Sequence, residues 1–142
     1  MGIDIRAFGE RRLQGGVWGH TGHHPFDWTH SDLVIYGFLA NIWNRESVPY
    51  ISEPRGLPID LSIGVLAALH SRKMVLIEAE HYDGCFGKSW LSVDELYRYD
   101  YTIIPKYHGG KTLREVLGDD FFEHLADLKK DCVERIVFWF HA

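Results

Sequence analysis

The sequence predicts a single α+β domain over residues 1–142, in which about three main helices cover a small mixed or antiparallel sheet. The chain has one domain's length, and its 46% hydrophobic and 25% charged residues are typical of a globular protein. Both ends of the chain have strand character, and we expect these two strands to lie in the same sheet. The two strands are expected at 3–10 and 134–140, and the three helices at 32–44, 60–82 and 112–132.

The first strand is predicted from alternation, because Ile3, Ile5 and Ala7 occupy every second position. A glycine-bearing turn follows at 14–16, and a returning strand is expected to begin at 17–18. Residues 19–30 show no periodicity, so they are expected to form a loop.

The segment 32–44 is apolar nearly all round, so this helix is expected to be buried and central, with Ser31 or Asp32 as its cap. Residues 45–61 hold three of the five prolines, which predicts a long loop with a stiff backbone. Long ordered loops in small domains often carry function.

Residues 60–82 contain no proline and one glycine, which favours one long helix, ended at 83–84. The alternative is a helix over 62–72 followed by a strand over 74–77. The glycine-bearing segment after it is expected to be a loop, anchored to the core at 90–91.

Two capping boxes, Ser92 with Glu95 and Thr112 with Glu115, predict a short helix over 93–99 and the start of the helix at 112–132. The second helix has a buried stripe of residues three or four apart. This stripe is Leu113, Leu117, Phe121, Leu125, Leu128 and Cys132, so Cys132 is expected to be a small buried hydrophobe.

Three further expectations concern the same half of the chain. Gly118 could break the helix at 112–132 in two, and residues 101–104 could form a short strand. The closing strand is apolar on both faces, so it must be central in the sheet or covered on both sides.

Fifteen Lys and Arg residues against twenty Asp and Glu residues give a formal net charge of −5. A protein that binds duplex nucleic acid normally has a basic surplus, so we do not expect that partner. The most apolar stretch, 33–43, is too short to cross a membrane, and the N-terminus does not have the pattern of a signal peptide. We therefore expect a cytoplasmic protein, no membrane partner, and reduced thiols at Cys85 and Cys132.

Four histidines, His20, His23, His24 and His30, lie close together in the expected loop and have the right chemistry for zinc. Their spacing is not that of a helical pair, and no cysteine lies nearby. The favoured interpretation is an exposed polar loop that takes up zinc or nickel adventitiously, so no cofactor is expected. The alternative is a metal site that serves a small metal-dependent hydrolase.

Arg55 is the favoured ligand-binding residue, because the prolines on either side of it restrict its backbone and Gly56 allows close approach. Its guanidinium could bind a carboxylate or phosphate. The alternative is that Arg55 pairs with Glu53 or a carbonyl and only pins its loop. The other residues expected at this site are Asn44 and Arg45 at the preceding helix end, Glu53, and Ser89 and Trp90 on the opposite wall.

A resemblance is carried by segments spread over most of the chain, at 1–5, 39–45, 51–58, 89–100 and 135–140. The most specific of them is Glu53-Pro54-Arg55-Gly56-Leu57-Pro58. Together they resemble a group of small uncharacterised proteins of tailed bacteriophages and prophages. Members often carry a histidine in the loop that here spans 83–88, where this chain has none. The resemblance implies a phage-type setting and no particular reaction.

These observations favour a non-enzymatic, phage-type accessory protein that binds a host protein or a small anionic ligand through the loop at 44–58. It would act in the host cytoplasm if it is phage-encoded. No catalytic residues are assigned, because spacing alone does not bring His81, Cys85 and Ser89 within reach of one another. A homo-oligomer is also considered, since a structural virion component would form stable oligomers.

Overall fold

The computed structural model describes residues 3–26, 33–75 and 85–141 and contains one four-stranded antiparallel sheet. The strands are β1 (Asp4–Arg12), β2 (Trp18–His20), β3 (Cys85–Ser92) and β4 (Arg135–His141), in the order β2-β1-β4-β3. The first and last strands pair directly, from Asp4 opposite His141 to Glu10 opposite Arg135. The α+β class and the shared sheet of the two terminal strands are thus confirmed.

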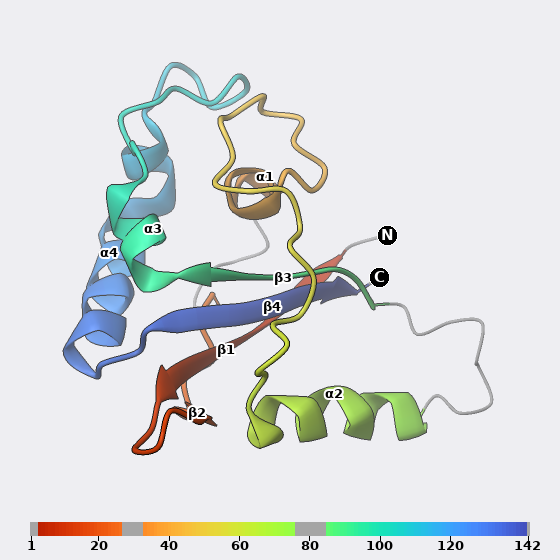
Figure 1. Cartoon of the computed structure of the whole chain (residues 1–142). Coiled ribbons are helices and arrows are strands. Elements are labelled where there is room, and N and C mark those ends of the chain that lie inside the picture. Colours follow the sequence, from red (N-terminus) through yellow and green to blue (C-terminus); the bar gives the residue numbers. More distant parts are fainter. Residues whose placement is uncertain (1–2, 27–32, 76–84, 142) are drawn as a thin grey trace.

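Strand β4 is central and buried along its whole length, as its two apolar faces predicted. Because side chains alternate across a strand, its residues divide between two separate cores. Ile136, Phe138 and Phe140 belong to the larger core, whereas Val137 and Trp139 belong to the smaller one. Figure 1 shows the reason, because helices lie on both sides of the sheet. The helices α1 (Leu33–Ala40), α3 (Val93–Arg98) and α4 (Leu113–Lys130) lie on one side, and α2 (Ile63–Val75) lies on the other.

The larger core contains α1 (Leu33–Ala40), whose residues 34–40 are all buried, as expected for a central helix. The helix ends four residues earlier than predicted. Asn41 and Trp43 have left-handed φ values of 56° and 46°, which end the helix although the apolar pattern continues to Trp43. Asparagine adopts this conformation more readily than most residues, so the helix can stop here without a glycine.

The capping boxes predicted for α3 (Val93–Arg98) and α4 (Leu113–Lys130) are both present, as is the break at Gly118, which has a φ of 79°. The prediction that Cys132 is buried is wrong. The helix ends at Lys130, and Cys132 is exposed with a φ of 60°. The buried position at this end of the helix is taken by Val133 instead.

Helix α2 (Ile63–Val75) starts behind Ser62, whose Oγ accepts a hydrogen bond from the Val65 amide at 3.3 Å. It packs Val65 and Leu69 onto the smaller core. Residues 74–75, where the alternative strand would begin, are helical. The rest of the predicted helix, 76–82, lies outside the described residues.

Two further predictions about strands are wrong. The segment expected to be a glycine-bearing loop after α2 contains strand β3, which has a bulge between Phe86 and Ser89. Residues 101–104 are not a strand: their carbonyls accept bonds from the first turn of α4, as in the 2.7 Å contact from the Leu113 amide to the Ile103 carbonyl. The returning strand after the first turn is confirmed as β2. None of the helices within the described residues is both long and apolar enough to cross a membrane.

Candidate functional site

The loop that carries Arg55 lies along the outer edge of β3. The Gly56 amide donates to the Lys88 carbonyl at 2.8 Å, and the Arg55 amide donates to Ser89 Oγ at 2.9 Å. The Arg55 guanidinium lies 4.7 Å from the centre of the Trp90 ring. The structure therefore brings together Arg55, Gly56, Ser89 and Trp90, as the sequence predicted, and the loop covers an edge strand that would otherwise be open.

The guanidinium of Arg55 is engaged by Glu95. Its Nη1 and Nη2 donate to the two carboxylate oxygens at 2.8 and 2.5 Å, and Nη1 also donates to the Trp90 carbonyl at 3.2 Å. The hydrogen bonds from Arg55 lower the pKa of Glu95 to about 2, and those same bonds raise the pKa of Arg55. Arg55 thus pins its loop, but through a partner 40 residues away and not through Glu53.

Glu95 has a second role, because it also completes the capping box of α3. Its Oε1 accepts from the Ser92 amide at 3.0 Å, while Ser92 Oγ accepts from the Glu95 amide at 3.1 Å. One carboxylate therefore joins the end of β3, the start of α3 and the Arg55 loop. Whether Arg55 also binds a ligand stays a prediction.

Asn44 and Glu53, two other residues predicted for the site, are linked by a series of hydrogen bonds. Asn44 holds the turn at 44–48, since its Oδ1 accepts from the Val48 amide at 3.1 Å. Asn44 Nδ2 donates to Asn41 Oδ1, and Asn41 Nδ2 donates to Glu53 Oε1, both at 3.0 Å. Asn44 and Glu53 are thus linked through Asn41, which the sequence did not single out, and Arg45 is exposed beside them.

A pocket of about 520 Å³ opens at the end of the sheet where β1 and β3 finish and β4 begins. Trp18 of β2 and Trp90 of β3 line it, together with the loop that leads into α2. The full lining is Arg12, Trp18, Leu57, Pro58, Ile59, Asp60, Trp90, Ser92, Glu134 and Arg135. Of these, the sequence singled out Trp90 alone as a site residue.

A buried ionic network forms one side of this pocket. Arg135 Nε donates to Glu10 Oε1 at 2.6 Å, and its Nη1 donates to Asp60 Oδ1 at 2.9 Å. Glu10 is fully buried, and the Arg135 side chain is 7% exposed, so each ion depends on its partner to offset the loss of water. The contact with Arg135 lowers the pKa of Asp60.

This network also fixes Trp18, one of the two tryptophans that line the pocket. The Trp18 indole N–H donates to Asp60 Oδ2 at 2.9 Å, and the Arg135 guanidinium lies 3.7 Å from the centre of the Trp18 ring. Glu10 Oε2 accepts from the Ser62 amide at 2.8 Å, which ties the start of α2 to the same group. The pocket wall is therefore held in place before any ligand binds.

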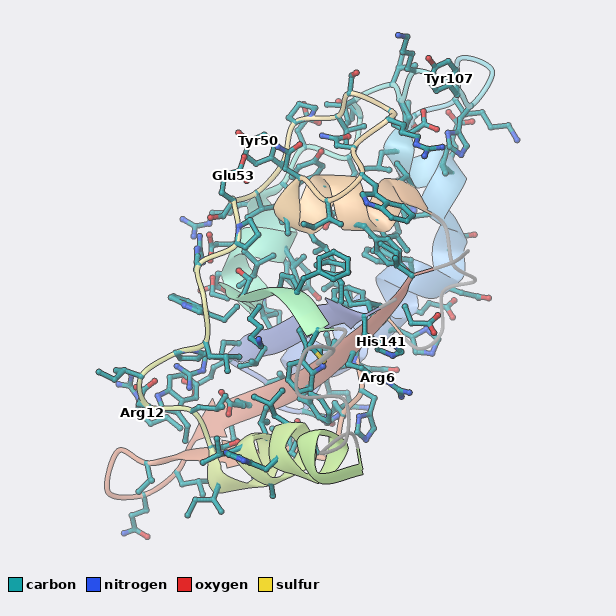
Figure 2. All side chains as sticks on the ribbon, turned by 90° about the vertical axis from the view of Figure 1, so that its right-hand side faces the viewer. Arg6, Arg12, Tyr50, Glu53, Tyr107 and His141 are labelled. Atoms are coloured by element: carbon teal, nitrogen blue, oxygen red, sulfur yellow. The ribbon has the colours of Figure 1, made fainter. Side chains whose placement is uncertain are left out.

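Arg12 differs from the other arginines of the site. Its guanidinium lies 5.0 Å from the centre of the Trp18 ring, and Figure 2 shows it at the end of β1, beside the loop that leads into α2. No carboxylate within the described part of the chain forms an ion pair with it. Glu134 accepts a hydrogen bond from the Arg12 backbone amide. Asp60 pairs with Arg135, so within the described residues Arg12 is the arginine of this pocket whose guanidinium forms no ion pair.

The three clustered histidines that the structure describes lie in two different places. His20 and His24 lie together, with ring centres 5.6 Å apart, and both pack edge-on against Phe8. His23 instead contacts Asp131, at 2.9 Å between Nε2 and Oδ2. His30 lies outside the described residues, and among those that are described no three histidine, cysteine or acidic side chains are grouped as metal ligands would be.

The group of His81, Cys85 and Ser89 is only partly described, since His81 falls outside the described residues. Cys85 and Ser89 both lie on β3, and Ser89 Oγ is buried and accepts from the Arg55 amide.

Comparison of the chain with protein-family models, with curated proteins and with solved structures gives no match.

Proposed function

We propose that this chain is a binding protein, whose pocket between Trp18 and Trp90 takes an anionic group joined to an apolar or flat group. The observation that carries the proposal is Arg12, a guanidinium at the pocket that forms no ion pair with any carboxylate the structure describes. The anion can belong to a small molecule or to an acidic side chain of a partner protein, since both present the same chemistry to an arginine.

The carboxylates of the pocket are engaged by other protein groups, which leaves the Arg12 guanidinium to a ligand. Asp60 and Glu134 are the two carboxylates in the lining, and both already accept hydrogen bonds from the protein. Arg12 lies over the Trp18 ring, so its side chain loses less freedom on binding than that of a solvated arginine. Two indole rings and Pro58 supply flat apolar walls beside the charge.

The loop at 44–58 contributes to this function by building the pocket. Its last residues, Leu57 and Pro58, line the cavity, and Arg55 rests on the Trp90 ring that forms one wall. The ion pair between Arg55 and Glu95 keeps this wall in position. The phage-type accessory setting belongs to the same proposal, with the host supplying the ligand or the partner.

A fluorescent aromatic sulfonate, 1-anilinonaphthalene-8-sulfonate, tests the pocket, because it combines a flat apolar body with one negative charge. Its dissociation constant would be measured by titration for the parent chain, Arg12→Gln and Arg11→Gln. Arg11 is the matched control: it is exposed and adjacent on β1, so its side chain points to the opposite face.

We expect Arg12→Gln to weaken binding about tenfold, the scale of one lost hydrogen bond to a charged group. Arg11→Gln should leave the dissociation constant within about twofold, as is usual for an exposed residue that makes no contact with the ligand. Equal effects of the two substitutions would show that the dye binds by general charge attraction, and the proposed site would be rejected.

A further inference from the structure

Three large aliphatic side chains next to the pocket are exposed to water, and we name them the apolar stripe. Ile59 is 106% exposed, Ile63 is 82% exposed and Leu66 is 41% exposed. Single exposed aliphatic residues are common on protein surfaces, but a contiguous group is typical of an interaction site.

The apolar stripe is continuous with the pocket and is not needed by the protein's own core. Ile59 lines the pocket, and Ile63 follows it by four residues at the start of α2. Ile63 and Leu66 are three residues apart, so they share one face of the helix. Figure 1 shows α2 on the side of the sheet opposite to the other described helices, and a different face of α2, with Val65 and Leu69, packs on that sheet.

The charged groups described next to the apolar stripe are those of the pocket, and they are not equally available to a partner. Asp60, which stands between Ile59 and Ile63 in the sequence, is already paired with Arg135. Arg12, whose guanidinium forms no ion pair with a carboxylate of the described residues, lies at the pocket end of the same surface. An acidic partner would therefore meet a complementary charge here.

We propose that the occupant of this surface is a short acidic segment of a partner protein. Its carboxylate side chain would pair with Arg12 in the pocket, and its apolar side chains would cover the apolar stripe. A small ligand could fill the pocket but would leave Ile63 and Leu66 in water, whereas a peptide reaches both. This inference rests on the proposed function of the pocket and names the class of its ligand.

The test uses a random library of dodecapeptides, displayed on messenger RNA and selected on the immobilised full-length chain. Peptides that bind the support without the protein are removed in each round. The best enriched peptide is then synthesised, and its dissociation constant is measured by fluorescence anisotropy. The matched control is Ile104→Lys, because Ile104 is 62% exposed. It belongs to the segment between α3 and α4, and Figure 1 shows that segment far from α2.

We expect enriched peptides that combine Asp or Glu with Leu, Ile or Phe. Ile63→Lys and Arg12→Gln should each weaken the chosen peptide at least tenfold, and Ile104→Lys should change it less than twofold. The inference is overturned if no common pattern emerges, if the pattern is basic, or if Ile63→Lys and Ile104→Lys act alike. In that case the aromatic sulfonate still tests the pocket. If Arg12→Gln weakens dye binding, the proposed function stands and only the peptide inference fails. If Arg12→Gln does not weaken dye binding, the proposed function is rejected too.

The fold of each variant is checked by circular dichroism and by its urea midpoint. Both lysine substitutions are made at exposed positions, so little change in stability is expected. If Ile63→Lys were to unfold α2, Leu66→Gln would replace it as a milder change on the same face. If neither substitution raises the dissociation constant of the peptide, the inference is contradicted.

Discussion

Glu95→Gln removes the carboxylate that joins the Arg55 loop to β3 and α3. Glutamine keeps the shape of the side chain and one oxygen that can accept from the Ser92 amide, but it cannot form a two-pronged ion pair with Arg55. We expect the variant to fold, since the rest of the core is unchanged, and to be less stable than the parent chain at neutral pH.

The size of the loss follows from the pKa of Glu95, which is lowered from 4.5 to about 2. A shift of that size corresponds to about 3 kcal/mol of folding stability at neutral pH. Because the side chains of Arg55 and Glu95 are 26% and 22% exposed, solvent screening reduces this value, and we expect about 2 kcal/mol.

The loss should depend on pH in a defined direction. The pKa of Glu95 is lower in the folded state than in the unfolded state, so its contribution is complete above about pH 4.5 and disappears as the pH falls towards 2. The difference between the parent chain and Glu95→Gln should therefore shrink to less than half of its neutral value by about pH 3.

Urea denaturation followed by circular dichroism, at pH 7 and at pH 3, measures both effects. The matched control is Glu123→Gln, an exposed glutamate on α4, which should change stability by less than about 0.5 kcal/mol. A loss from Glu95→Gln that is equally large at both pH values, or no larger than that of the control at pH 7, would show that the ion pair does not stabilise the fold.

Four further outcomes are expected. Arg55→Lys should lower the free energy of unfolding in urea by about 1 kcal/mol, because an ammonium group cannot contact both Glu95 oxygens at once. Glu10→Ala should lower the melting temperature by about 10 °C, since it leaves Arg135 buried without its main partner; a change under about 2 °C would contradict this. A strong chelator should leave the melting temperature unchanged, and a drop of many degrees would reveal a structural metal site at the clustered histidines. Solubility should be lowest near pH 6, because the isoelectric point of the sequence is about 5.9 and molecules without net charge repel each other least; turbidity measured across pH 5–8 checks this.

The sequence by itself determined the features that depend on neighbouring residues. The capping boxes at Ser92 and Thr112 are predicted correctly because both partners of each box lie within one helical turn. The closing strand was correctly expected to be central, since a strand that is apolar on both faces has no stable place at an open edge. Arg55 also lies beside Ser89 and Trp90, as expected, although these residues are 34 and 35 positions away and no local pattern brings them together.

Strand β3 and the end of α1 could not be predicted, because neither depends on a local pattern. The segment at 85–92 contains a glycine and a lysine and shows weak alternation, so it becomes a strand through its pairing with β4. Helix α1 stops while the apolar pattern continues, because Asn41 and Asn44 close a turn whose bonds reach Val48 and Glu53.

The residues that line the pocket come together only in the tertiary structure. Glu10 and Arg135 are 125 residues apart, and they meet because β1 and β4 pair in a register that places them opposite each other. Arg12 and Trp18 carry no motif that marks them, and their role arises from the loop before α2 that closes over them. Contacts between distant residues depend on strand register and on how the loops cross the sheet, and a single sequence encodes these only through the whole fold.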